Sequence, residues 1–425
     1  MNFNSLKLKG EVDIPGDKSI SHRAIMLSSI STGKNKVKNF LNGEDCLSTI
    51  DCFCKMGIQV ETCRKNEIII HGIGLRGLKK PIDKLYVGNS GTTIRLIMGI
   101  LSGQNFKSTL IGDDSIAKRP MKRVTDPLRL MGAKIFGNED ANFTPITIDG
   151  GNLNGIDYKM PIASAQVKSS IILASLYANS PTKIIEKNKS RNHTEIMLKS
   201  FGADIDVSGN EIYVNPAQNL YSEDIYVPGD ISSAAFFMAG ASMLKGSEVL
   251  IKNVGLNETR TGILDVLNDM GGNFELLNKK YVCGELMGDI LVKHSNLNST
   301  TIDSKLIPRL IDEIPIIAVM ATQAEGTTII KDAKELKVKE SNRISSVVSN
   351  LKKMGADIEE LDDGMIINGP TKLNGCSIES FSDHRIAMAF SIASLVAFGH
   401  TNIDNTKCVE ISFPRFYDIL KEITY

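Results

Sequence analysis

The sequence predicts a two-domain protein of mixed α/β (α+β) class, in which one structural unit occurs six times, three times in each domain. A Met-Gly-type pentapeptide recurs five times, with its glycines at positions 57, 132, 202, 271 and 355. Apolar residues with helical spacing precede each copy, and alternating apolar residues follow it. The chain has 425 residues, more than one compact core usually holds, so two domains are expected.

Each unit is predicted to be a helix that ends at the glycine, followed by a β-hairpin. Residues 193–200 and 344–353 are two of these predicted helices. Glycine suits a helix end because it adopts the left-handed backbone conformation at no steric cost. Residues 205–214 show the predicted hairpin, since Ser208-Gly209-Asn210 separates two short alternating runs.

The two ends of the chain are expected to meet and complete the sixth unit. Residues 414–423 predict a helix with no hairpin after it, and residues 6–14 predict a strand with no helix before it.

A six-residue motif that occurs twice in the chain predicts the domain boundaries. Ile14-Pro15-Gly16-Asp17-Lys18-Ser19 is matched by Val227-Pro228-Gly229-Asp230-Ile231-Ser232, half the chain later. The chain is therefore expected to cross between domains near Pro15 and Pro228. One domain would be continuous, 16–227, and the other would combine 1–15 with 228–425. The ligand site is expected in the cleft between them.

Composition excludes several classes of function. Lys and Arg together number 49, as do Asp and Glu, so the formal net charge is zero. Zero charge argues against bulk binding of nucleic acid or anionic membranes. The seven scattered cysteines and the absence of a signal pattern or membrane-length apolar run predict a cytoplasmic protein with free thiols. No metal-ligand spacing and no cofactor motif occurs, so neither group is expected.

Two turns in the first half could receive an anion. In the first, Lys18, Ser19 and Arg23 lie where a strand leads into a helix, and a helix N-terminus favours negative charge. In the second, Gly88-Asn-Ser-Gly91 also opens a helix. Taken alone, the first turn is more typical of an ordinary capped helix with a solvated lysine, and the second is equally compatible with an ordinary capped helix.

Further polar turns follow. Arg119 precedes Pro120, which biases its backbone toward an extended conformation. Ser164-Ala165-Gln166 and Ser190-Arg191-Asn192-His193 each precede a helical run, where capping alone would explain the serines.

The second half adds three charged clusters: Asp312-Glu313-Ile-Pro, Lys339-Glu340-Ser-Asn-Arg343 and Asp383-His-Arg385. If residues 339–343 are helical, Lys339 and Arg343 share one face. Arg385 precedes a very apolar run, so it is expected near the core, where a guanidinium needs an anionic partner. So many basic turns in a neutral protein predict a small, multiply anionic substrate pair, with Asp312, Glu340 and Lys18 as candidates for proton transfer.

These residues resemble the EPSP synthases, enolpyruvyl transferases of the shikimate pathway, from one end of the chain to the other. The matching motifs are Gly16-Asp-Lys-Ser-Ile-Ser-His-Arg23, Gly88-Asn-Ser-Gly-Thr-Thr-Ile-Arg95, Lys118-Arg-Pro-Met121, Ser164-Ala-Gln166, Asp312-Glu-Ile-Pro315, Lys339-Glu-Ser-Asn-Arg343 and Asp383-His-Arg385. The resemblance implies a two-domain inside-out α/β barrel of six βαβαββ-type units, acting as a monomer without a cofactor.

The resemblance also implies the reaction. The enolpyruvyl group of phosphoenolpyruvate (PEP) would pass to the 5-hydroxyl of shikimate 3-phosphate by addition and elimination, releasing phosphate. Implied catalytic residues are Asp312, Glu340 and Lys18. Those implied for shikimate 3-phosphate are Lys18, Ser19, Arg23, Ser164, Ala165, Gln166, Arg191, Asp312 and Lys339. Those implied for PEP are Lys18, Asn89, Gly91, Arg119, Gln166, Arg343 and Arg385. The herbicide glyphosate occupies the PEP site in this family, and Gly91 leaves room for it, so sensitivity is expected.

The sequence departs from the family pattern at three places, one of which is Glu335, where some members have asparagine. Ala165 stands where many members have serine, and Ile411 stands where many have a lysine two residues before Phe-Pro. Two other functions remain open. One is the related transferase that acts on UDP-N-acetylglucosamine, although residues 112–123 lack the cysteine of that family. The other is a non-catalytic repeat scaffold that binds anions, although Asp312 and Glu340 would weaken such binding.

Overall fold

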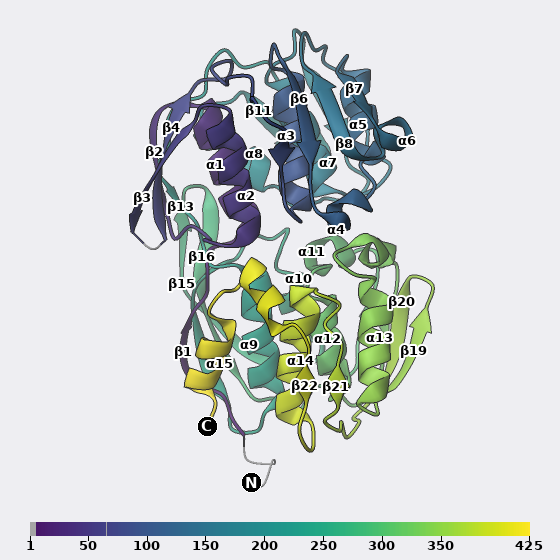
Figure 1. Ribbon diagram of the computed structural model, residues 1–425. Helices are drawn as coiled ribbons and strands as arrows, with labels where there is room; N and C mark the ends of the chain where they lie inside the picture. Colours follow the sequence, from purple (N-terminus) through teal and green to yellow (C-terminus); the bar gives the residue numbers. More distant parts are fainter. Residues whose placement is uncertain (1–5, 65) are drawn as a thin grey trace. The chain divides into compact units, whose positions relative to one another are not determined.

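The computed structural model describes residues 6–64 and 66–425, and its elements are labelled in Figure 1. The chain separates into two compact units. Unit 2 contains Gly16–Val227 together with Val282–Gly284. Unit 1 contains the described residues up to Pro15, then Pro228–Tyr281 and Glu285–Tyr425. Each unit has its own apolar core.

Three four-stranded sheets of the same topology make up unit 2. In each, the first two strands are parallel and the remaining pairs are antiparallel. Their orders are β13 (Ile225–Tyr226), β2 (Thr32–Lys38), β4 (Glu67–Ile73), β3 (Gln59–Arg64); β5 (Leu85–Tyr86), β6 (Lys107–Ile111), β8 (Phe143–Asp149), β7 (Lys134–Gly137); and β9 (Asp157–Lys159), β10 (Thr182–Ile185), β12 (Glu211–Val214), β11 (Ile205–Ser208).

Helices α1 (Lys18–Ile30), α3 (Gly91–Ser102) and α7 (Ala165–Ser175) supply the centre of this unit, because nearly all of their residues are buried. Buried polar side chains of these helices form hydrogen bonds with one another, as Arg23 of α1 does with Ser169 of α7. The remaining helices of the unit are α2 (Glu44–Lys55), α4 (Asp114–Ala117), α5 (Lys122–Leu130), α6 (Asn138–Ala141) and α8 (His193–Ser200).

Unit 1 repeats this plan with two four-stranded sheets and one two-stranded sheet. Their orders are β1 (Lys9–Asp13), β14 (Glu248–Gly255), β16 (Glu285–Lys293), β15 (Asn273–Val282); β17 (Thr301–Ile302), β18 (Gly326–Ile330), β20 (Gly364–Gly369), β19 (Asp357–Leu361); and β21 (Ser377–Ile378), β22 (Asn402–Ile403). Its helices are α9 (Ile231–Met243), α10 (Gly262–Asp269), α11 (Ile307–Leu310), α12 (Ile314–Ala321), α13 (Arg343–Lys353), α14 (His384–Val396) and α15 (Phe416–Ile423), with 3₁₀ helices η2 (Lys334–Val338) and η3 (Thr406–Ile411).

The predicted helix ends are confirmed. Helices α2, α5, α8, α10 and α13 each finish two residues before the glycine of their pentapeptide, with one capping residue between. Those five glycines have φ values between 75° and 101°, in the left-handed region that side chains disfavour. A hairpin follows each of the five helices.

The ends of the chain meet, as predicted. Lys7 and Tyr425 exchange two backbone hydrogen bonds, of 3.0 and 2.9 Å. Strand β1 then pairs in parallel with β14 and not with β22. Strand β13, which leads into α9 and β14, is itself paired with β2 and leaves that edge of β14 open for β1. The sheet of β21 and β22 therefore has no hairpin among the described residues.

Two further features concern the solvent environment of the chain. The seven cysteine side chains are all free thiols. Within residues 6–64 and 66–425, no helix is long and apolar enough to cross a membrane.

Candidate active site

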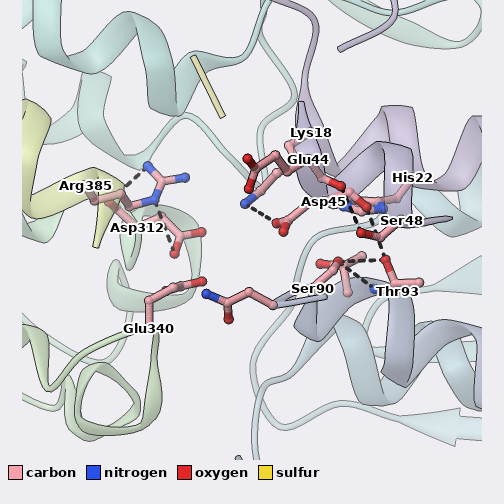
Figure 2. Close-up of polar contacts among 12 residues, drawn as sticks. Lys18, His22, Glu44, Asp45, Ser48, Ser90, Thr93, Asp312, Glu340 and Arg385 are labelled. Atoms are coloured by element: carbon pink, nitrogen blue, oxygen red, sulfur yellow. Dashed lines mark hydrogen bonds and ion pairs between the residues drawn. The ribbon is translucent and has the colours of Figure 1, made fainter. Parts of the chain in front are cut away.

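Lys18 is the first residue of α1 and is held by a carboxylate. The side chain of Asp17 caps the helix by accepting a hydrogen bond from the Ile20 amide, at 2.9 Å. Lys18 Nζ lies 2.9 Å from Oδ2 of Asp45, in the first turn of α2 (Figure 2). The pair is only partly buried, so an anionic ligand could compete with Asp45 for the ammonium group.

Arg23 lies one turn further along α1 and is anchored to two other helices. Its Nε donates to the Thr194 hydroxyl at 2.6 Å, and its Nη2 donates to the Ser169 hydroxyl at 2.8 Å. Its Nη1 donates to the backbone carbonyl of Ser19 at 2.9 Å. Because Thr194 is on α8 and Ser169 on α7, this buried guanidinium fixes the first turn of α1 against both helices.

The second predicted turn begins α3. The Ser90 side chain caps this helix by accepting from the Thr93 amide at 3.1 Å. Nη2 of Arg119 donates to Oδ1 of Asn89 at 2.9 Å. A Cβ added to Gly91 would lie 3.1 Å from Nη1 of Arg119 and 3.4 Å from Nη1 of Arg95. Glycine therefore lets two guanidinium groups approach the start of a helix.

Arg95 belongs to this site although the sequence reasoning did not assign it a role. It is 5% exposed, and its Nη1 donates to Oε1 of Gln166 at 2.5 Å. Nε2 of Gln166 donates in turn to the Thr92 hydroxyl at 3.1 Å. The signal was present in the sequence, because Arg95 follows Gly91 by four residues and must share its helix face.

The remaining predicted residues of unit 2 lie at helix starts. Ser164 caps α7, accepting from the Val167 amide at 3.4 Å, and Ala165 is the first residue of that helix. Arg191 is half-buried in the segment just before α8. Capping, the alternative considered for Ser164, is thus what its side chain does in this structure.

In unit 1, three cations converge on Asp312. Its Oδ1 lies 3.2 Å from Nζ of Lys339, 3.2 Å from Nη1 of Arg343 and 4.0 Å from Nε of Arg385. Nη1 of Arg385 also donates to the backbone carbonyl of Asp312 at 3.2 Å. Figure 2 shows Asp312, Glu340 and Arg385 together, and Arg385 is buried as predicted.

Arg343 is the central residue of this cluster and is fully buried. Its Nε and Nη2 donate to the two carboxylate oxygens of Asp383, at 2.8 and 3.2 Å, and its Nη2 also donates to Glu340 at 2.6 Å. Burial alone would lower the pKa of Arg343, but the charges of Asp383 and Glu340 outweigh it and raise that pKa. Burial would raise the pKa of Asp383, but Arg343 holds it below its ordinary value.

The predicted helix across residues 339–343 is wrong. Lys339 has an extended backbone, with φ −82° and ψ −155°, and α13 begins only at Arg343. Asn342 sets this start, because its side chain accepts from the Ser345 amide. Lys339, Glu340 and Arg343 nevertheless come together, since the turn rather than a helix face directs them toward Asp312 and one another.

Two carboxylates of the site were missed. Asp383 forms an ion pair with Arg343 and caps α14. From the sequence, only Arg385 in this motif was assigned a role. Asp45 holds Lys18, and only its place at a helix start could have indicated this. Ile411 ends η3 and packs against the apolar core of unit 1. Among the described residues, no group of three or more His, Cys, Asp or Glu could hold a metal ion.

Comparison with known proteins identifies the family. The profile of the family described as EPSP synthase (3-phosphoshikimate 1-carboxyvinyltransferase) matches residues 4–420. The chain belongs to the EPSP synthase family. It is 54% identical to a 3-phosphoshikimate 1-carboxyvinyltransferase of Bacillus pumilus over 98% of this chain and 97% of that one. It is 56% identical to the protein of the same name from Thermoanaerobacter sp., over 96% of each chain.

The fold agrees with solved EPSP synthases. A structure of EPSP synthase from Acinetobacter baumannii superposes with a TM-score of 0.88 at 44% identity, covering 98% of this chain and 96% of that one. The mixed α/β class predicted from the sequence is therefore confirmed.

Proposed function

We propose that this chain transfers the enolpyruvyl group of PEP to the 5-hydroxyl of shikimate 3-phosphate, giving 5-enolpyruvylshikimate 3-phosphate and phosphate. The family match over residues 4–420 carries this proposal. The two clusters support it, since Arg343 and Arg385 surround Asp312 in one unit, and Arg95 and Arg119 flank Gly91 in the other.

The substrate-binding roles are assigned by charge and position. For shikimate 3-phosphate we propose Lys18, Ser19, Arg23, Ser164, Ala165, Gln166, Arg191, Asp312 and Lys339. For PEP we propose Lys18, Asn89, Gly91, Arg119, Gln166, Arg343 and Arg385. Guanidinium groups suit PEP because they bind carboxylate and phosphate through two parallel hydrogen bonds.

The proposed chemistry has an addition step and an elimination step. In the addition, Asp312 accepts the proton of the 5-hydroxyl as that oxygen attacks C2 of PEP, and the methylene carbon takes a proton from Lys18. Asp312 suits this role because Lys339 and Arg343 favour its ionised form. In the elimination, phosphate leaves C2 while Glu340 removes a proton from the new methyl group. Nη2 of Arg343, 2.6 Å from Oε2 of Glu340, holds that carboxylate in place.

We make further proposals about how the two units act and about the whole protein. Residues of both units would act on one pair of substrates, and water would be excluded from the reactive intermediate while they do so. We also propose that each unit forms half of an inside-out α/β barrel, and that the protein works as a cytoplasmic monomer without a cofactor.

The test is phosphate release from PEP by the purified protein with three acceptor conditions. One sample contains shikimate 3-phosphate, the second contains UDP-N-acetylglucosamine, and the third contains no acceptor. We expect release only with shikimate 3-phosphate. Release only with the nucleotide sugar would mean that the protein catalyses the related reaction on UDP-N-acetylglucosamine. Tight anion binding without any phosphate release would favour the scaffold function.

A further inference from the structure

Four buried side chains form a continuous hydrogen-bonded chain through unit 2. Nδ1 of His22 on α1 lies 2.7 Å from the Thr49 hydroxyl on α2. That hydroxyl lies 2.7 Å from the Thr93 hydroxyl on α3, which donates to Ser90 at 2.7 Å. All four side chains are fully buried. Figure 2 labels His22, Ser90 and Thr93. We call this set the hydroxyl relay.

Counting protons gives the relay a single direction. The Thr93 hydroxyl donates to Ser90, so the single proton of Thr49 lies toward Thr93, with the backbone carbonyl of Asp45 as a second acceptor at 3.2 Å. Thr49 then has no proton left for His22, so Nδ1 of His22 must be the donor to Thr49. His22 is therefore the neutral Nδ1–H tautomer, and its Nε2 is buried without a hydrogen-bond partner. A second proton at Nε2 would have nowhere to bond, which keeps the ring uncharged.

The relay connects the turn of Lys18, a residue assigned to both substrates, with the Gly91 turn, which is assigned to PEP. It begins four residues after Lys18 and passes beside Asp45, whose backbone carbonyl accepts from Thr49 at 3.2 Å. It ends at Ser90, the residue between Asn89 and Gly91. The hydroxyl oxygen of Ser90 accepts hydrogen bonds from both the amide and the hydroxyl of Thr93, so the orientation of this turn depends on these two bonds.

Arg23 is held by a separate set of contacts. Its guanidinium donates to the Ser169 and Thr194 hydroxyls, which lie 2.7 Å from each other. None of these contacts includes a member of the relay. Arg23, which is assigned to shikimate 3-phosphate alone, therefore has anchors outside the relay.

We propose that Thr49, Thr93 and His22 are positioning residues that hold the Gly91 turn in register with Lys18 and thereby set the affinity for PEP. The inference rests on the proposed function. The relay touches no substrate and acts through the backbone of residues 88–91. Gly91 has little tolerance for movement, because the space beside it is limited by Arg119 and Arg95 at 3.1 and 3.4 Å from an added Cβ. Loss of the hydroxyl relay should therefore affect PEP binding more than binding of shikimate 3-phosphate.

The test compares Thr93→Val with Thr93→Ser. Valine keeps the shape of threonine without the hydroxyl, whereas serine keeps the hydroxyl. We expect Thr93→Val to raise the KM for PEP about tenfold, the effect of one buried hydrogen bond, and to change the Kd for shikimate 3-phosphate less than twofold. Thr93→Ser should restore a KM close to that of the wild type. Thr49→Val is the second relay variant, in case Thr93→Val does not fold.

Two controls separate positioning from general damage. Thr109→Val removes a half-buried hydroxyl that bonds Thr147 in another sheet of the unit, and it should leave both constants unchanged. Thr194→Val removes the acceptor of Arg23 and should show the opposite pattern, with the Kd for shikimate 3-phosphate raised more than the KM for PEP. Melting temperatures report any loss of stability separately.

Two outcomes would overturn the inference alone. One is an unchanged KM for PEP in both relay variants while the wild-type enzyme turns over normally. The other is an equal rise of both constants in Thr93→Val, which would indicate a merely structural role. Absence of turnover by the wild type with shikimate 3-phosphate would instead overturn the proposed function, and this inference with it.

Discussion

The buried histidine of the relay makes the stability of unit 2 depend on pH. Burial lowers the pKa of His22 from 6.5 to about 3, more than Asp45 raises it, and Lys18 and Arg23 lower it further. In the unfolded chain the same ring titrates near its ordinary value. Replacing His22 by asparagine keeps an N–H donor close to the position of Nδ1 and removes the titrating ring. The His22→Asn variant therefore isolates this one contribution.

The direction and size of this pH dependence follow from the difference in proton binding between the folded and the unfolded state. Between pH 6.5 and 3 the unfolded state binds a proton that the folded state does not, so acid stabilises the unfolded state. The stability that the neutral ring provides is complete above pH 6.5 and is lost as the pH falls toward 3. The free energy of unfolding then changes by up to about 1.4 kcal/mol per pH unit. Between pH 7 and pH 4.5, wild-type unit 2 should lose about 2.5 kcal/mol of this free energy through His22 alone.

Urea unfolding at pH 7, 6, 5 and 4.5 measures this loss, with hydrogen exchange of amides in α1, α2 and α3 as the readout for unit 2. We expect the stability of His22→Asn to fall less steeply with acid than that of the wild type. His71→Asn is the matched control, because His71 lies on the surface beside Glu61 and its replacement should leave the steep acid dependence in place. Parallel curves for the wild type and His22→Asn would refute the reasoning.

Three further predictions concern single side chains. Gly91→Ala should raise the inhibition constant of glyphosate more than the KM for PEP, because the added methyl group must displace Arg119 by a few tenths of an ångström; enzyme kinetics with both ligands measures this. Asp312→Asn should lower kcat by about 10²- to 10⁴-fold and change the Kd for shikimate 3-phosphate far less, as kinetics and calorimetry would show. Lys168→Met should destabilise unit 2 by about 3–5 kcal/mol in urea, because buried Lys168 lies 2.9 Å from Glu186 and 2.7 Å from Glu195.

Each of these predictions has an outcome that contradicts it. Equal changes in the two constants would remove the steric explanation for Gly91. Unchanged turnover would remove Asp312 from the mechanism. For Lys168 the control is Lys183→Met, which breaks an exposed pair with Glu211, and similar losses in the two variants would mean that burial adds nothing to the pair.

The repeated unit could be predicted because its signal is local. Each left-handed glycine lies just past the capping residue of a helix, so the five pentapeptides locate five helix ends from the sequence alone. The pairing of β1 could not be predicted in this way. It depends on which strand edge is left open once β13 has paired with β2, and no local pattern records that.

The site was predicted to a similar extent. Cations in turns can be identified from sequence: Lys18 and Arg385 lie at predicted helix starts, and Arg119 precedes Pro120. Their partners come from other elements: Asp45 lies 27 residues from Lys18, and Asp312 lies 73 residues from Arg385. Tertiary packing alone brings these groups together, which is why Arg95 and Asp383 were not assigned roles.

The central claim is enolpyruvyl transfer by addition and elimination, and proton NMR of the reaction in D₂O tests it most directly. PEP and shikimate 3-phosphate are incubated with the wild-type protein, and the vinyl signals of the product are followed. The added proton makes a methyl group that can rotate before elimination, so the account predicts an enol ether with deuterium in its vinyl positions and one phosphate released per product. Phosphate without an enol ether, or an enol ether that contains only protium, would contradict it.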